Sequence, residues 1–177
     1  ILPSHLQQLL CESLGKHHNS DNERLTTPSG KLVFGDEGPN AQHSFFQLLH
    51  QGDSIIPIQF IGIRSALEKT DQQYHQGLID AMSAQIHALA YGKDSKNAPD
   101  NFNGNRPSTT LLLDTLSPKS LGGLVSFYEN MEFFEGLLLN INPFDQPGVE
   151  LGKSVMKTLQ EGSHPHEMLS ILSNLLK

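Results

Sequence analysis

The sequence predicts an α/β fold, specifically a three-layer α/β/α sandwich with a mostly parallel sheet. Residues 55–61 and 109–113 form short runs of apolar and β-branched side chains, which is typical of strands buried on both faces. The segments around them repeat apolar residues at helical spacing, so that strands alternate with helices. The 177 residues are enough to bury one core, and we expect one domain.

The first predicted helix begins at Ser4, which caps it, and Gln7 completes a capping box. Gly15 is a suitable terminator. The apolar stripe of this helix consists of four leucines: Leu6, Leu9, Leu10 and Leu14. A polar stretch at 17–30 follows, and the apolar residues 32–34 are expected to form the end of a strand.

A second helix is predicted from a cap at Asn40 to about Gln51, where Gly52 stops it. After the strand at 55–61, residues 72–91 repeat apolar side chains with helical periodicity. A polar loop at 93–104 then leads into the strand at 109–113.

The last part of the chain is predicted to hold a helix at 118–134, a short strand at 136–139 and two further helices. These final helices are expected at 147–160 and 165–176. Together with the earlier strands, this order predicts a sheet covered by helices on both faces.

Charge and composition exclude several classes of protein. The formal net charge is −7 and no basic stripe is present, so we expect no nucleic-acid partner. The same acidic balance fits poorly with a phosphate group held by this chain alone. The apolar runs are too short to span a bilayer, and the single cysteine, Cys11, excludes an intramolecular disulfide. We therefore expect a cytosolic protein without a membrane partner.

The segment from Asn142 to Lys153 is the most informative part of the chain. Pro147 stands where a helix would begin, a position at which its missing N–H costs little. Gln146 precedes that helix and Lys153 lies seven residues later, on the same face. If residues 136–139 are a strand, the amide and the ammonium project from a strand-to-helix junction, where α/β sheets usually bind ligands.

Two further residues could carry chemistry. His43 is expected in the first turn of its helix, where the dipole disfavours an imidazolium, so a neutral, proton-exchanging ring is expected. Glu12 lies off the leucine stripe near a helix end, where its charge gains nothing from the dipole, which suits a base. For both, an ordinary solvated side chain is the alternative. A metal site at His43 and His50 is not expected, because no carboxylate joins them at ligand spacing.

Four segments together resemble the glucose-6-phosphate isomerase family. The run from Gly136 to Lys153 resembles its C-terminal signature, and residues 38–52 resemble its histidine-bearing helix. Residues 12–16 are similar to its glutamate-bearing ESNGK stretch, with Leu14 where the family usually has asparagine. Residues 104–108 resemble a further family segment, and the order of all four matches.

The resemblance implies a role for each candidate. Glu12 corresponds to the base that carries a proton between C1 and C2 of the open-chain sugar. His43 corresponds to the group that helps open the ring, reaching a neighbouring subunit's site in a homodimer. Lys153 corresponds to a cation that assists ring opening, and Gln146 to a substrate-binding amide. The implied reaction converts glucose 6-phosphate to fructose 6-phosphate through a cis-enediol, and it needs no redox cofactor and no metal.

The family's chains are far longer, and residues 1–177 look like the C-terminal sugar-isomerase (SIS) domain of a two-domain enzyme, without its N-terminal strand or strands. The phosphate-gripping Ser/Thr-rich loop and the Gly-Gly-Arg segment of the family do not occur in this sequence. We therefore expect these residues alone not to run efficient isomerisation. The alternative is a non-catalytic sugar-phosphate-binding or dimerisation module with the same fold.

Overall fold

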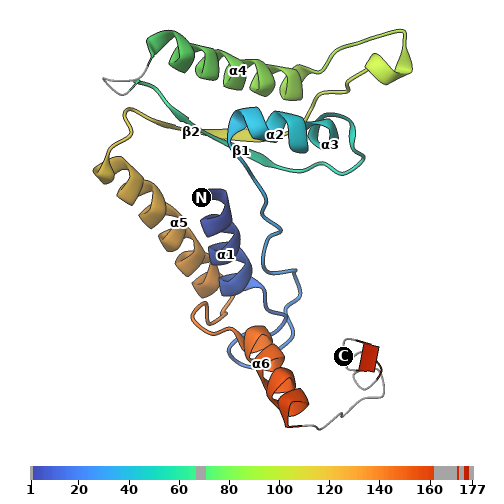
Figure 1. The fold of residues 1–177 in the computed structure, drawn as a ribbon, viewed down its shortest axis with the longest axis vertical. Coiled ribbons are helices and arrows are strands. Elements are labelled where there is room, and N and C mark those ends of the chain that lie inside the picture. Colours follow the sequence, from blue (N-terminus) through green and yellow to red (C-terminus); the bar gives the residue numbers. More distant parts are fainter. Residues whose placement is uncertain (1, 67–70, 162–170, 172–173, 176–177) are drawn as a thin grey trace. The chain divides into compact units, whose positions relative to one another are not determined.

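The computed structural model describes residues 2–66, 71–161, 171 and 174–175. The chain divides into two compact units, drawn in Figure 1. The first comprises residues 1–6 and 33–131, and the second comprises residues 7–32 and 132–177. The second unit is thus assembled from two segments that are distant in the sequence.

The first unit contains the sheet and most of the helices. Its elements are α2 (Gly38–Ser44), α3 (Phe46–Gln51), β1 (Ile58–Ile63), α4 (Gln72–Tyr91), a short 3-10 helix η1 (Ala98–Asp100), β2 (Ser108–Leu113) and the first part of α5 (Pro118–Leu138). The second unit contains most of α1 (Leu2–Leu14), the end of α5, and α6 (Pro147–Gln160).

β1 and β2 pair in parallel, with Ile58 opposite Ser108 and Ile63 opposite Leu113. Helices cover both faces of this pair. Gly62 of β1 faces α4, since a Cβ placed on it would lie 2.8 Å from the Met82 side chain. Gln59 faces the other way and accepts a hydrogen bond from the Tyr128 hydroxyl of α5. Because side chains of a strand alternate between faces, α4 and α5 lie on opposite sides. The predicted α/β/α layering with a parallel sheet is confirmed in this unit.

The core of the first unit lies where α2, α3 and α4 meet β1. Figure 1 shows α4 running beside the strand pair. The buried side chains of this cluster are Ala41, Phe46, Leu49 and Leu89. Arg106, directly before β2, donates hydrogen bonds to the carbonyl oxygens of Gly52 and Ser54 at 2.7 and 3.2 Å. This guanidinium therefore fixes the loop that connects α3 to β1.

β1 begins later than the sequence predicted, and two further predicted strands are not formed. β1 starts at Ile58 rather than at residue 55, because Pro57 has no N–H to donate to a ladder. Residues 32–34 do not form a strand: they pair with no strand in the described part of the chain, and Leu32 is 97% exposed. The strand predicted at 136–139 is also wrong, since α5 continues to Leu138.

The helix at 136–138 follows from the pattern that precedes it. Leu124, Tyr128 and Glu132 are buried at four-residue spacing and form one helical stripe. α5 ends where Asn140 adopts a left-handed φ of 53° and the amide of Ile141 donates to the Gly136 carbonyl at 2.8 Å. An apolar run at the end of such a stripe extends the helix rather than starting a strand.

The other helices agree with the sequence to different degrees. The helices predicted at 72–91 and 147–160 are confirmed, and the one at 118–134 is longer by one turn. The predicted helix over 40–51 is two helices, because Phe45 leaves helical geometry at φ −127° and ψ 0°. Most of the helix predicted at 165–176 lies outside the described residues. None of the described helices has the length and apolar character needed to cross a membrane.

Candidate active site

The segment between α5 and α6 connects two helices, not a strand and a helix as predicted. Asn142 organises it: its side-chain oxygen accepts a hydrogen bond from the Phe144 amide at 3.1 Å, which forms a tight turn. α6 then begins at Pro147, as predicted, with Gln146 as its N-cap residue. Because this segment does not follow a strand, the usual ligand site at the ends of parallel strands does not apply to it. A ligand would be bound here by the side chains of the segment itself.

Gln146 and Lys153 are both exposed on α6. The Gln146 side chain makes no capping hydrogen bond, while its carbonyl accepts from the amides of Val149 and Glu150 at 3.0 and 3.2 Å. Lys153 donates to Glu150, one turn earlier on the same helix, at 2.6 Å. The Lys153 side chain remains 62% exposed, so this ion pair contributes little and leaves the ammonium accessible.

Glu12 lies in the last turn of α1, which ends at Leu14. Its side chain is exposed, whereas Leu6, Leu10 and Leu14 are buried on another face of the helix. The prediction that Glu12 lies off the leucine stripe is confirmed. Leu14 is fully buried, and an apolar side chain at this position serves the packing of α1.

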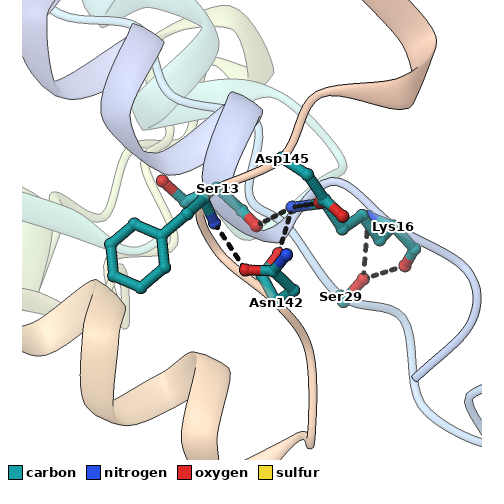
Figure 2. Close-up of polar contacts among 6 residues, drawn as sticks. Ser13, Lys16, Ser29, Asn142 and Asp145 are labelled. Carbon is teal, nitrogen blue, oxygen red and sulfur yellow. Dashed lines mark hydrogen bonds and ion pairs between the residues drawn. The ribbon is translucent and has the colours of Figure 1, made fainter. Parts of the chain in front are cut away.

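Lys16 connects the end of α1 to the loop before α6, as Figure 2 shows. Its ammonium donates to the carbonyl oxygens of Ser13 and Asn142 at 2.7 and 2.6 Å, and pairs with Asp145 at 3.0 Å. Its backbone exchanges hydrogen bonds with the Ser29 hydroxyl. A lysine ammonium has three donors, so these three acceptors satisfy it completely. Glu12 directly precedes Ser13, and Gln146 directly follows Asp145. Both candidate residues are therefore next in sequence to a binding partner of Lys16.

His43 is not in the first turn of its helix. α2 begins at Gly38 with Glu37 as its N-cap, which places His43 in the last turn, one residue before the end of α2. The helix dipole therefore does not disfavour an imidazolium here, contrary to the prediction. Its side chain is exposed. His43 belongs to the first unit, while Glu12, Gln146 and Lys153 belong to the second.

Glu132 is a buried carboxyl group that sequence reasoning missed. It is 2% exposed, and neither of its oxygens has a hydrogen-bond partner among the described residues. Burial raises the pKa of Glu132 to about 7, an effect that the positive charge of Lys31 reduces and the negative charge of Glu135 increases. The four-residue spacing from Leu124 and Tyr128 was the signal that could have revealed it. Within the described residues, no three His, Cys, Asp or Glu side chains are grouped so as to hold a metal ion.

A family model decides the relationship of this chain to known proteins. The model described as phosphoglucose isomerase matches residues 1–173. The chain belongs to the phosphoglucose isomerase family. The match includes all four segments that carry the resemblance.

Curated relatives agree with the family match. A glucose-6-phosphate isomerase from Novosphingobium aromaticivorans is 44% identical over 162 residues, covering 92% of this chain and 32% of the relative. One from Treponema denticola is 41% identical over 179 residues, covering 98% and 34%. The chain thus spans about a third of the length of these phosphoglucose isomerases.

Solved structures carry the same fold. A crystal structure of a glucose-6-phosphate isomerase from Chlamydia trachomatis matches 99% of this chain and 36% of its own, with a TM-score of 0.88 and 36% identity. A hypothetical protein from Thermus thermophilus matches 90% of this chain and 38% of its own, with a TM-score of 0.66 and 27% identity. The α/β architecture of this chain is therefore shared with both of these proteins.

Proposed function

We propose that this chain supplies part of the active site of an aldose–ketose isomerase that interconverts glucose 6-phosphate and fructose 6-phosphate. Family membership over residues 1–173 is the observation that carries the proposal. Glu12, His43, Gln146 and Lys153 are all present at the positions where the family resemblance expects them, and all four side chains are exposed to solvent.

Glu12 is the proposed proton carrier. Its carboxylate removes the proton from C2 of the open-chain aldose, the C–H electron pair forms the C1–C2 double bond, and the carbonyl π pair moves to O1, which takes up a proton to give a cis-enediol. The carboxylic acid then delivers a proton to C1 while the O2 hydroxyl loses its proton and becomes the ketose carbonyl, and exchange of the carried proton with solvent in between allows deuterium to enter C1. A single exposed carboxylate is sufficient for this transfer, because the proton leaves and returns on one face of the sugar.

The other three residues prepare the substrate. His43 and Lys153 open the sugar ring by exchanging a proton with the ring oxygen and hydroxyl, and the Gln146 amide binds a substrate hydroxyl. The exposed Lys153 ammonium can leave Glu150 at small cost, since exposed ion pairs contribute about 0–1 kcal/mol. The unused side-chain amide of Gln146 is likewise ready to bind a ligand.

The test uses the complete natural polypeptide that contains these residues. Glu12→Gln should lower kcat on glucose 6-phosphate by about 10² or more and equally slow the appearance of solvent deuterium at C1 of the product. Glu161→Gln, which changes an exposed glutamate on the same unit, serves as the matched control and should retain full activity. Equal activity in both variants would exclude Glu12 as the base. A wild-type polypeptide that binds sugar phosphates without converting them would favour the binding-module alternative.

We further propose that the complete polypeptide acts as a homodimer in which His43 completes the partner's site. Mixing inactive Glu12→Gln and His43→Ala subunits then creates hybrid dimers with one intact site each. Random exchange should restore about a quarter of wild-type activity, because half of the dimers are hybrids with one of two sites working. If Glu12 and His43 act within one subunit, mixing restores nothing.

A further inference from the structure

The structure assigns Lys16 as a positioning residue that holds Glu12 and the Gln146 loop in a fixed relation. This inference rests on the proposed function, because it concerns the geometry of the same site. Lys16 itself is not proposed to touch substrate.

The contacts of Lys16 are unusually complete for a lysine. Its side chain is only 12% exposed, and its three ammonium donors have three acceptors at 2.6–3.0 Å. A buried ammonium without partners would be costly, so the three acceptors and the cation are expected to remain together. Figure 2 shows these acceptors converging on the ammonium from two segments of the chain.

The acceptors are placed next to the proposed reacting groups. The Ser13 carbonyl follows Glu12 directly and belongs to the carboxyl-terminal end of α1, where a cation is favoured by the helix dipole. The Asn142 carbonyl and the Asp145 carboxylate belong to the loop that ends at Gln146. Lys16 thus connects the backbone next to the proposed base directly with the backbone next to the proposed binding amide.

The loop needs such a connection. Gln146 has no side-chain cap, and the Asp145 side chain is 54% exposed, so neither fixes the start of α6 through burial. The Lys16 ammonium holds the part of the loop next to Gln146, at Asn142 and Asp145, whereas the hydrogen bonds from Ser20 and to Asp21 hold it at Asn140, further from Gln146. Loss of this cation should let the loop move relative to Glu12 while each helix keeps its own hydrogen bonds. Displacements of about 1 Å can cost up to about 10²-fold in rate when a catalytic geometry is spoiled.

The kinetic test compares Lys16→Met with Lys157→Met in the complete polypeptide. Methionine keeps most of the apolar stem of lysine but removes the cation. Lys157 is the control because it is an exposed lysine of α6, and its ammonium lies 3.9 Å from the carboxylate of Glu161. For Lys16→Met, kcat should fall roughly ten- to a hundredfold with a smaller change in KM, because the relation between Glu12 and the loop is disturbed while Gln146 supplies only one of the proposed substrate contacts. Lys157→Met should match the wild type.

A second readout separates positioning from general stabilisation. Hydrogen exchange followed by mass spectrometry should show faster exchange at the amides of Phe144 and Val149 in Lys16→Met, with α4 unchanged. In a double-mutant cycle, Asp145→Ala should lower kcat alone but add nothing in the Lys16→Met background. A lower unfolding temperature with unchanged kcat and unchanged exchange at 142–150 would overturn the inference.

The outcomes also separate this inference from the proposed function. If Glu12→Gln abolishes isomerisation while Lys16→Met behaves like Lys157→Met, the function stands and the positioning role is wrong. If Glu12→Gln retains activity, the proposed function fails. The exchange measurement then still decides whether Lys16 holds the loop, because it does not depend on turnover.

Discussion

Glu132 should give the protein a stability that decreases as pH rises. Its carboxyl is buried without a hydrogen-bond partner in the described part of the chain, and its pKa rises from 4.5 to about 7 on folding. Between these values the folded state binds more protons at this site than the unfolded state does. The contribution of a neutral Glu132 is therefore complete below about pH 4.5 and is lost as pH rises to about 7. The difference corresponds to about 3 kcal/mol.

The perturbation that exposes this effect is Glu132→Gln, which keeps the shape of the side chain and removes its titration. Thermal unfolding of the complete polypeptide should be followed for variant and wild type from about pH 5 to about pH 8, a range that spans the shifted pKa. The midpoints should nearly coincide at the acidic end, and at the basic end the variant should unfold several degrees higher. Subtracting the two curves removes the titration of every other group.

Two controls sharpen the measurement. Glu129→Gln changes an exposed glutamate of the same helix and should show no such pH dependence. In Lys31→Met, the pH range over which the contribution of Glu132 to stability is lost should move upward, because the positive charge of Lys31 lowers the pKa of Glu132. A midpoint difference between Glu132→Gln and wild type that stays constant across the whole pH range would refute the reasoning.

Four further stability predictions can be checked by unfolding midpoints of the complete polypeptide. Gly92→Ala should be strongly destabilising, because φ is +66° and the new Cβ would lie 2.0 Å from the Phe102 carbonyl oxygen. Gly77→Ala, in open space on α4, should instead stabilise by about 0.5–1 kcal/mol. Asp71→Ala should cost about 1 kcal/mol, since Asp71 caps α4 through two backbone amides. Arg106→Met should cost about 2–3 kcal/mol, because two carbonyl groups lose a charged donor.

The sequence was sufficient to place helices and strands wherever a single hydrophobic periodicity dominated a segment. The alternating strand and helix patterns placed β1, α4 and β2 within a few residues, and the proline at 147 marked the start of α6. It failed for residues 136–139, because a short apolar run is compatible with a buried strand and with the end of a buried helix. The break at Phe45 also left no local signal, since both halves of the segment favour a helix.

The candidate site shows the same division. The positions of Glu12 and Gln146 at helix ends followed from local patterns. The convergence on Lys16 did not, because its partner Asn142 lies 126 residues away and no periodicity connects them. The burial of Glu132 could have been read from the stripe of α5, but only by accepting a carboxyl at an apolar position.

The discontinuity of the second unit has a consequence for biosynthesis. Residues 33–131 are contiguous, so the strands and α4 can fold as soon as they leave the ribosome. Lys16 must wait for Asn142, which is made 126 residues later. At usual rates of translation this delay is roughly 6–25 seconds. During that interval the second unit is incomplete, so the leucine side chains of α1 stay exposed. We expect a chaperone to bind this apolar face until Asn142 has been made.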